Sequence, residues 1–130
     1  NSVELGGYRY PTLTVYADTS EETVYNFIKA IDLSYELFKN ITPVMYRWKL
    51  DLAVGTPVDA PIHKGTIKYL KEKNLWSDED ERWNNQRIER LNTLLEGWEK
   101  FLTKNKDLTD EDFTSKWLEE RKILLAKFLK

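Results

Sequence analysis

The sequence predicts a mostly α-helical protein with a single short β-strand. Two observations favour this class. Apolar residues recur at steps of three and four along much of the chain, which is the period of an amphipathic helix. Alternation of apolar residues with other residues is convincing only at residues 10–17, and a period of two is typical of a strand with one buried face.

The predicted strand has the sequence YPTLTVYA at residues 10–17. Leu13, Val15 and Ala17 share one face, and Pro11 suits the beginning of a strand because a missing N–H is tolerated there. A lone strand cannot pair its own backbone groups. The sequence therefore implies either a second copy of the chain or a larger protein that supplies the other strands.

The segment DTSEET predicts the beginning of the first helix. Thr19 and Glu22 have the spacing of a capping box, and Ser20 is a competing cap. An apolar stripe follows to about residue 40, formed by Val24, Phe27, Ile28, Ile31, Tyr35 and Phe38. A second helix is predicted from Thr42, as its cap, with Pro43 in the first helical position, and it ends before Gly55.

Three further helices are predicted after the loop at residues 55–61. The first is short, over residues 63–73; the other two begin after the caps Ser77 and Thr109. Their apolar stripes are Ile88, Leu91, Leu95, Trp98 and Leu102, and then Phe113, Trp117, Arg121, Leu124, Leu125 and Phe128. A short polar loop between the last two predicts an antiparallel hairpin, so we divide the chain at residues 1–76 and 77–130.

Composition argues against several kinds of function. The net charge is −2, with 20 basic and 22 acidic residues, so nucleic-acid binding is not indicated. Cysteine is absent, which excludes disulfides, thiol catalysis and thiolate metal sites. A single imidazole, without a nucleophile signature beside it, indicates neither an enzyme nor a metal site, and no cofactor is predicted.

The stretch PIHKG at residues 61–65 permits two interpretations. His63 and Lys64 suit an anion clamp at the beginning of a helix, where free N–H groups attract negative charge. Alternatively, His63 orders the turn by bonding to backbone while Gly65 permits close packing, and we favour this structural role. Glu72 lacks a partner carboxylate and is not predicted to act in catalysis. The acidic run at residues 78–81 is interpreted as a capped helix start rather than a divalent-cation site, since consecutive side chains on a helix diverge.

The sequence resembles the C-terminal part of solute-binding proteins of the TRAP transporter TAXI family. One feature is the proline-led strand followed by AD and a helix containing VYNFIKAI. The other is similar to the family pattern P-hydrophobic-H-x-G-A…Y-x-x-E-x-G, and its residues here are Pro61, His63, Gly65, Tyr69, Glu72 and Trp76. The resemblance covers residues 8–76. This chain has Thr66 where the family favours Ala and Asn74 where it favours Gly.

The resemblance implies a receptor outside the cytoplasm, in the periplasm or its equivalent. Such receptors have two lobes that close around a small organic, often acidic, solute and deliver it to a membrane permease driven by an ion gradient. The chain would be the C-terminal fragment of this two-lobed α/β periplasmic-binding-protein-like fold, without a signal peptide. It would support the binding site rather than complete it.

Three assignments remain open at this point. Tyr8, Arg9 and Tyr10 precede the strand, where such a receptor can touch solute and Arg9 suits a carboxylate; an exposed turn is the alternative. The tryptophans of the last two helices (Trp83, Trp98 and Trp117) either pack internally or serve a self-contained intracellular protein–protein interaction module. An isolated fragment is expected to form a homodimer in which residues 12–16 of two copies pair antiparallel.

Overall fold

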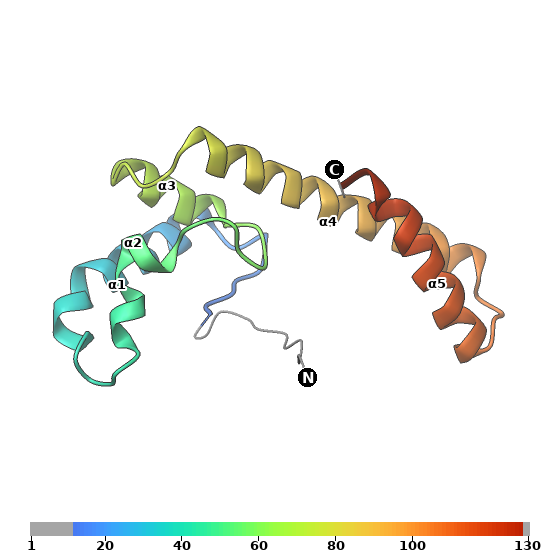
Figure 1. Cartoon of the computed structure of the whole chain (residues 1–130), viewed down its shortest axis with the longest axis horizontal. Coiled ribbons are helices and arrows are strands. Elements are labelled where there is room, and N and C mark those ends of the chain that lie inside the picture. Colours follow the sequence, from blue (N-terminus) through green and yellow to red (C-terminus); the bar gives the residue numbers. More distant parts are fainter. Residues whose placement is uncertain (1–11, 129–130) are drawn as a thin grey trace, which may run out of the picture. The chain divides into compact units, whose positions relative to one another are not determined.

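A computed structural model describes residues 12–128, and the regular structure in this range is helical (Figure 1). Its elements are α1 (Glu21–Phe38), the 3-10 helix η1 (Met45–Trp48), α2 (Leu50–Ala53), α3 (Lys64–Glu72), α4 (Asp78–Lys104), α5 (Asp110–Leu125) and the 3-10 helix η2 (Ala126–Phe128). The predicted mostly helical class is therefore confirmed for the described part of the chain.

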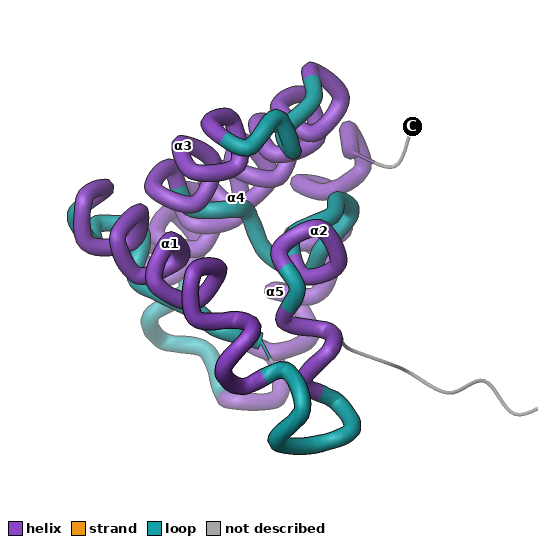
Figure 2. The backbone as a smooth tube through the Cα atoms, turned by 90° about the vertical axis from the view of Figure 1, so that its left-hand side faces the viewer, coloured by secondary structure: helices purple, strands orange, loops and turns teal. Residues whose placement is uncertain are grey.

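The predicted strand is wrong for the described residues. Residues 12–16 have no regular structure and residues 17–18 form a turn, and Figure 2 shows only helix and loop along the described tube. The alternating pattern is real, but a strand also requires paired backbone groups, and no second strand lies within residues 12–128. Leu13, Val15 and Tyr16 are accordingly exposed.

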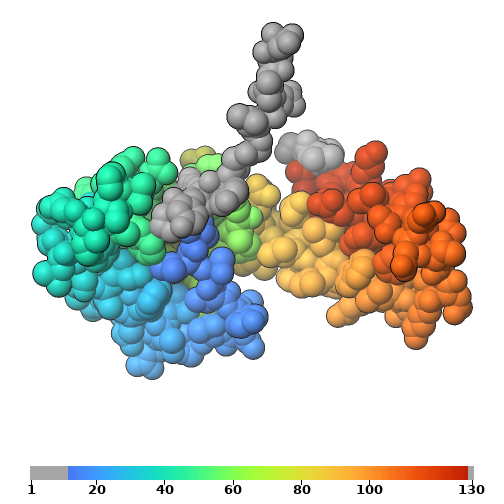
Figure 3. All heavy atoms as spheres, turned by 90° about the horizontal axis from the view of Figure 1, so that it is seen from below, coloured from blue at the N-terminus to red at the C-terminus, as the bar shows by residue number. Residues whose placement is uncertain are grey.

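The chain forms two compact units, Asn1–Asn84 and Asn85–Lys130. Their division falls inside α4, whereas the sequence places a boundary after residue 76. In Figure 3 the described N-terminal unit runs from blue to yellow and the C-terminal unit continues to red. We describe each unit separately.

The N-terminal unit has a small core in which α1 packs against α3. Leu50, Tyr69 and Leu70 are buried at its centre, and four partly buried residues pack around them: Tyr25, Ile28, Val54 and Trp76. Complete burial of a leucine or aromatic side chain contributes about 1.5–3 kcal/mol. Together these residues hold α1, α2 and α3 around one cluster.

The cap of α1 is Ser20, the competing residue, rather than Thr19. The Ser20 side chain accepts a hydrogen bond from the Thr23 N–H at 3.1 Å. The backbone carbonyl of Thr19 instead bonds to the side chain of His63. This contact between distant parts of the chain is not visible in local sequence.

The predicted second helix is broken into two shorter elements and begins later than Thr42. η1 starts at Met45, and Lys49 then adopts an extended conformation, with ψ of 130°, before α2. Side chains on either side of this break have different partners: the Trp48 ring meets Phe38, while Leu50 enters the core. Helices this short are marginal alone, so packing decides where the chain bends.

The C-terminal unit is a pair of antiparallel helices joined by aromatic side chains. The ring of Trp98 on α4 lies 4.7 Å from that of Trp117 on α5, and Phe101 lies 5.0 Å from Phe113. Lys127 pairs with Glu89 at 2.8 Å toward the other end. Later residues of α4 therefore contact earlier residues of the segment formed by α5 and η2, which shows that the two helices run antiparallel.

Candidate functional site

The motif from Pro61 to Trp76 lies where the chain enters α3, follows it, and passes into α4. His63 is the N-cap of α3, and its Nδ1 accepts a hydrogen bond from the Gly65 N–H at 3.1 Å. Its Nε2 lies 3.1 Å from the Thr19 carbonyl, so the tautomer that satisfies both contacts carries the proton on Nε2. Both imidazole nitrogens are thus engaged by backbone, which leaves neither directed at a ligand.

Gly65 is buried where α3 crosses α1. A Cβ at this position would lie 2.8 Å from both the Tyr25 nitrogen and the Val24 Cβ, and it would also collide with the Glu21 carbonyl oxygen. Two of these three atoms belong to the α1 backbone, which cannot turn aside as a side chain can. The close crossing therefore requires glycine.

Tyr69 is fully buried on α3, and its hydroxyl donates to Asp32 of α1 at 2.7 Å. Burial raises the pKa of the Tyr69 hydroxyl, and its bond to the Asp32 carboxylate acts in the same direction. Lys73 pairs with the same carboxylate at 3.2 Å. On the next turn Glu72 accepts a hydrogen bond from the hydroxyl of Tyr25. The motif tyrosine and glutamate thus both join α3 to α1.

Asn74 ends α3 in the left-handed conformation, with φ of 57°. The Leu75 N–H bonds to the Leu70 carbonyl and the Asn74 N–H to the Lys71 carbonyl, which is the pattern of a Schellman C-cap. Asparagine tolerates this conformation better than most residues other than glycine. The departure from the family pattern at this position is therefore compatible with the same turn.

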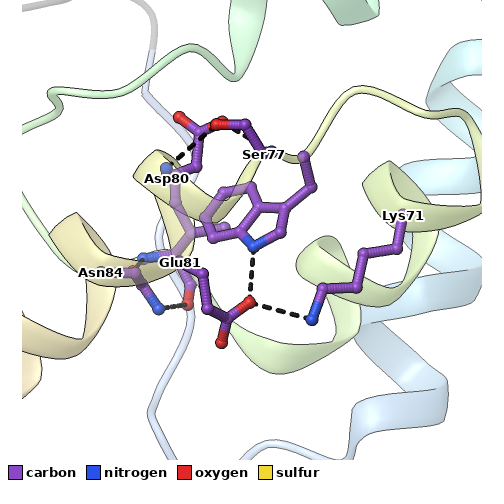
Figure 4. A network of polar contacts seen from close by, with 7 residues as sticks. Lys71, Ser77, Asp80, Glu81 and Asn84 are labelled. Carbon is purple, nitrogen blue, oxygen red and sulfur yellow. Dashed lines mark hydrogen bonds and ion pairs between the residues drawn. The ribbon is translucent and has the colours of Figure 1, made fainter.

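A polar network joins α3 and the loop before it to the first two turns of α4 (Figure 4). The indole of Trp76 donates to Glu81 at 2.7 Å, and Lys71 pairs with the same carboxylate at 2.9 Å. The hydrogen bond from Lys71, followed by that from Trp76, lowers the pKa of the Glu81 carboxyl. The last residue of the motif therefore anchors α4.

Asp80 caps its own helix and also reaches the preceding loop. It accepts hydrogen bonds from the Ser77 hydroxyl at 2.6 Å, from the Ser77 N–H at 2.9 Å, and from the Thr56 hydroxyl. These bonds, that from the Ser77 side chain first, lower the pKa of Asp80. The acidic run at residues 78–81 thus contains two side chains that bind protein groups, as a capped helix start requires.

Asn84 also belongs to this network, although the sequence pattern does not predict it. Its side chain is 2% exposed, and it accepts from the Ile62 N–H at 2.7 Å and donates to the Ile62 carbonyl at 3.3 Å. The amide satisfies both backbone groups of a residue just before His63 (Figure 4). An asparagine within a polar helical stretch carries no local signal of this role.

Other predicted positions are not brought into this network. Tyr8, Arg9 and Tyr10 lie outside the described residues. Trp98 and Trp117 pack against each other in the C-terminal unit. An open groove of 680 Å³ lies between α4 and α5 in that unit, and its lining includes Gly97, Phe101 and Leu124 together with several lysines and glutamates.

Within residues 12–128 the side chains do not gather into a metal-binding cluster of three or more His, Cys, Asp or Glu residues. None of the helices in this part of the chain has the length and hydropathy that crossing a bilayer requires. The network of Figure 4 consists of pairwise contacts that join α3 and the loop before it to the beginning of α4. These contacts hold the helices in place.

Comparison with known proteins gave a match to a family model. Residues 10–73 match the model of the NMT1-like family. This range is slightly less than half of the chain, and it is similar to a family related to solute-binding proteins of the TAXI and NMT1 type. It contains His63, Gly65, Tyr69 and Glu72 but stops before Trp76. No curated protein and no solved structure gave a match.

Proposed function

We propose that the chain is part of an extracytoplasmic solute-binding receptor that delivers a small organic, acidic solute to a TRAP-type ion-coupled permease. The observation that carries this proposal is the NMT1-like match over residues 10–73, since relatives of this family bind solutes without transforming them. In this proposal the chain acts without catalysis and lies in the periplasm or its equivalent, where proteins of this family typically lie.

The geometry of the motif supports an indirect contribution to binding. His63, Gly65, Tyr69 and Glu72 each contact α1 or the turn before it. We therefore assign them to holding the helices of the receptor together. Solute selection would belong to other residues. Tyr8, Arg9 and Tyr10 are candidates because they precede residues 12–16 in the sequence and the guanidinium of Arg9 suits a carboxylate.

Exposed apolar side chains on the N-terminal unit also support a place inside a larger fold. Leu33 and Leu37 of α1 are 69% and 84% exposed, and Leu13 and Val15 precede the helix. A helix that is apolar on two sides is typical of burial between two layers. In the proposed receptor, an adjoining lobe would cover this side of α1.

A self-contained intracellular interaction module is the second candidate, and the same exposed residues favour it. The reading frame upstream of Asn1 separates the two. We expect a targeting segment followed by an α/β pattern; a start codon beside Asn1 would favour the module instead.

A binding experiment on the complete upstream-extended protein tests the function directly. We expect small carboxylates to raise its melting temperature, and matched neutral amides to leave it unchanged. Deletion of the gene should abolish ion-driven uptake of the same carboxylate. Failure of every carboxylate in a broad panel, with uptake intact in the deletion strain, would contradict the proposal.

A further inference from the structure

His63 is the only histidine of the chain, and both nitrogens of its ring contact backbone groups. In the tautomer that satisfies both contacts, Nδ1 accepts a hydrogen bond from the Gly65 N–H and Nε2 donates to the carbonyl of Thr19, each at 3.1 Å. One imidazole thus caps α3 and ties the beginning of that helix to the turn before α1. We call Thr19, His63 and Gly65 the histidine clasp.

The histidine clasp requires a neutral ring. A neutral imidazole has one N–H and one lone pair, whereas an imidazolium has two N–H groups and no acceptor. A proton on Nδ1 would therefore face the Gly65 N–H, which is also a donor. Gly65 cannot move away, because backbone atoms of α1 lie against it. The ring would have to turn, and turning also withdraws Nε2 from Thr19.

The beginning of α3 is also unfavourable for a further positive charge. The N-terminus of a helix carries a partial positive charge, and α1, α4 and α5 each have acidic residues in the first turn. The first turn of α3 has none, and the helix begins with Lys64. A charged His63 would add to this positive end.

Glu21 of α1 acts in the opposite direction. Its carboxylate would attract an imidazolium, but it already pairs with Lys68 at 3.0 Å. The hydrogen bond from Lys68 is the main cause of the lowered pKa of Glu21, and the charges of Lys64 and His63 contribute less. A carboxylate that is partly exposed and already paired attracts a further charge weakly. The loss of two backbone bonds outweighs this attraction.

The other segments next to the clasp supply exposed or neutral groups. Three further carboxylates are near in sequence to the clasp or to the loop before α3, and all are exposed: Asp18, Glu22 and Asp59. From α4, the amide of Asn84 bonds to Ile62 and carries no charge. Because solvent screens the exposed carboxylates, the backbone bonds of His63 determine which form of the ring the fold prefers.

We propose that the histidine clasp is a proton-sensitive latch, closed while His63 is neutral and open when its ring takes up a proton. Opening frees the beginning of α3 from the turn before α1. An imidazole ordinarily changes its charge between pH 5 and 8. The unfolded chain accepts the proton without losing these bonds, so the stability that the clasp provides is complete at the upper end of this range and is lost as the pH falls through it. The latch does not depend on the proposed receptor function.

Nuclear magnetic resonance of the 130-residue chain with ¹⁵N-labelled histidine tests the closed state. The chain gives the signals of a single imidazole, because it has one histidine. At about pH 8 we expect the proton on Nε2 and a lone pair on Nδ1. A proton on Nδ1 at this pH would overturn the proposal, since the Gly65 N–H would then have no acceptor on the ring.

Urea denaturation between about pH 8 and about pH 5 tests the effect of the proton. We expect the unfolding equilibrium constant of the wild-type chain to rise by about tenfold over this range, which is a usual effect of losing a helix cap. His63→Asn is the matched control, because its side-chain oxygen can accept from the Gly65 N–H and takes up no proton in this range. Its equilibrium constant should change by less than about twofold.

Exchange of the Gly65 amide hydrogen locates the opening. As the pH falls, exchange in the wild-type chain should become about tenfold faster relative to His63→Asn at the same pH. His63→Ser also keeps a capping oxygen and replaces the asparagine variant if that variant does not fold. A wild-type stability that is constant over the range would overturn the latch. So would equal pH dependence in the wild-type chain and the variant, either in stability or in Gly65 exchange.

Discussion

Gly65 lies where there is no room for a side chain, so its substitution gives a direct measure of the α1–α3 contact. We predict that Gly65→Ala lowers the free energy of unfolding by about 3 kcal/mol, at the upper end of the usual range for overpacking, because the new Cβ meets backbone atoms of α1. Urea denaturation measures the change.

Gly55→Ala is the matched control for this substitution. A Cβ at Gly55 would meet nothing within 4 Å, and its φ is not positive. We expect the free energy of unfolding to stay the same or rise by about 0.5 kcal/mol. Equal losses in the two variants would show that α1 and α3 do not cross closely at Gly65.

His63 offers a second prediction at the level of a single side chain. His63→Ala removes the cap of α3 and the bond to Thr19, and we expect a loss of about 1–2 kcal/mol in unfolding free energy. His63→Asn keeps a capping oxygen and should lose less. In the complete receptor, the affinity for solute should change little. A large loss of affinity at unchanged melting temperature would make His63 a ligand residue.

At this scale the sequence predicts helix caps better than long-range contacts. Thr109 caps α5 as its local pattern indicates, because a cap bonds within three residues. Asn84 and Ile62 are 22 positions apart, and nothing in the residues around Asn84 indicates the bond. The structural role of Gly65 was inferred from its motif, but its neighbours on α1 are known only from the fold.

At the scale of elements, the joint between α3 and α4 should make the protein sensitive to acid. Hydrogen bonds lower the pKa of Asp80 and of Glu81 below their ordinary values of 3.8 and 4.5. Their contribution to stability is therefore complete above those values and is lost as the pH falls through the lowered pKa values. We predict that unfolding free energy decreases steadily below about pH 4.5.

Urea denaturation between pH 7 and pH 3 measures this decrease. The double variant Asp80→Asn with Glu81→Gln should be less stable at neutral pH and should lose less stability on acidification than the wild-type chain. Asp78→Asn, on the same turn of α4, is the control. An unchanged pH dependence in the double variant would show that Asp80 and Glu81 do not cause the loss of stability in acid.

The elements also show why sequence patterns predicted helices well and the strand poorly. A helix pairs its own backbone, so the apolar stripe of α1 and the caps of α4 and α5, Ser77 and Thr109, are sufficient local information. A strand depends on a neighbour, and residues 12–16 have none among the described residues. The break at Lys49 also depends on contacts that are distant in sequence. Trp48 packs against Phe38 and Leu50 enters the core, and these separate contacts decide where the helix breaks.

At the scale of the whole molecule, the N-terminal unit extends beyond the NMT1-like match. That match ends at residue 73, but the first two turns of α4 supply Asp80, Glu81 and Asn84 to the unit. We predict that a chain ending at residue 90 unfolds cooperatively, whereas a chain ending at residue 76 does not. The shorter chain leaves the backbone of Ile62 without its amide partner.

Circular dichroism during urea denaturation distinguishes the two truncated chains. The chain ending at residue 90 should show a single sigmoidal transition with most of the expected helix. A similar transition in the chain ending at residue 76 would show that α4 is dispensable for the N-terminal unit. A transition in neither would show that the C-terminal unit is also needed.

The two buried glycines should have different evolutionary histories. The atoms nearest to a Cβ at Gly97 would be those of the Leu124 side chain, whereas a Cβ at Gly65 would meet the backbone of another helix. A side chain can shorten or change rotamer in compensation, so lineages can exchange Gly97 for alanine when the residue facing it becomes smaller. No single compensating substitution moves the backbone of α1. Descendants of this protein should therefore drift freely at Gly97 and remain fixed at Gly65.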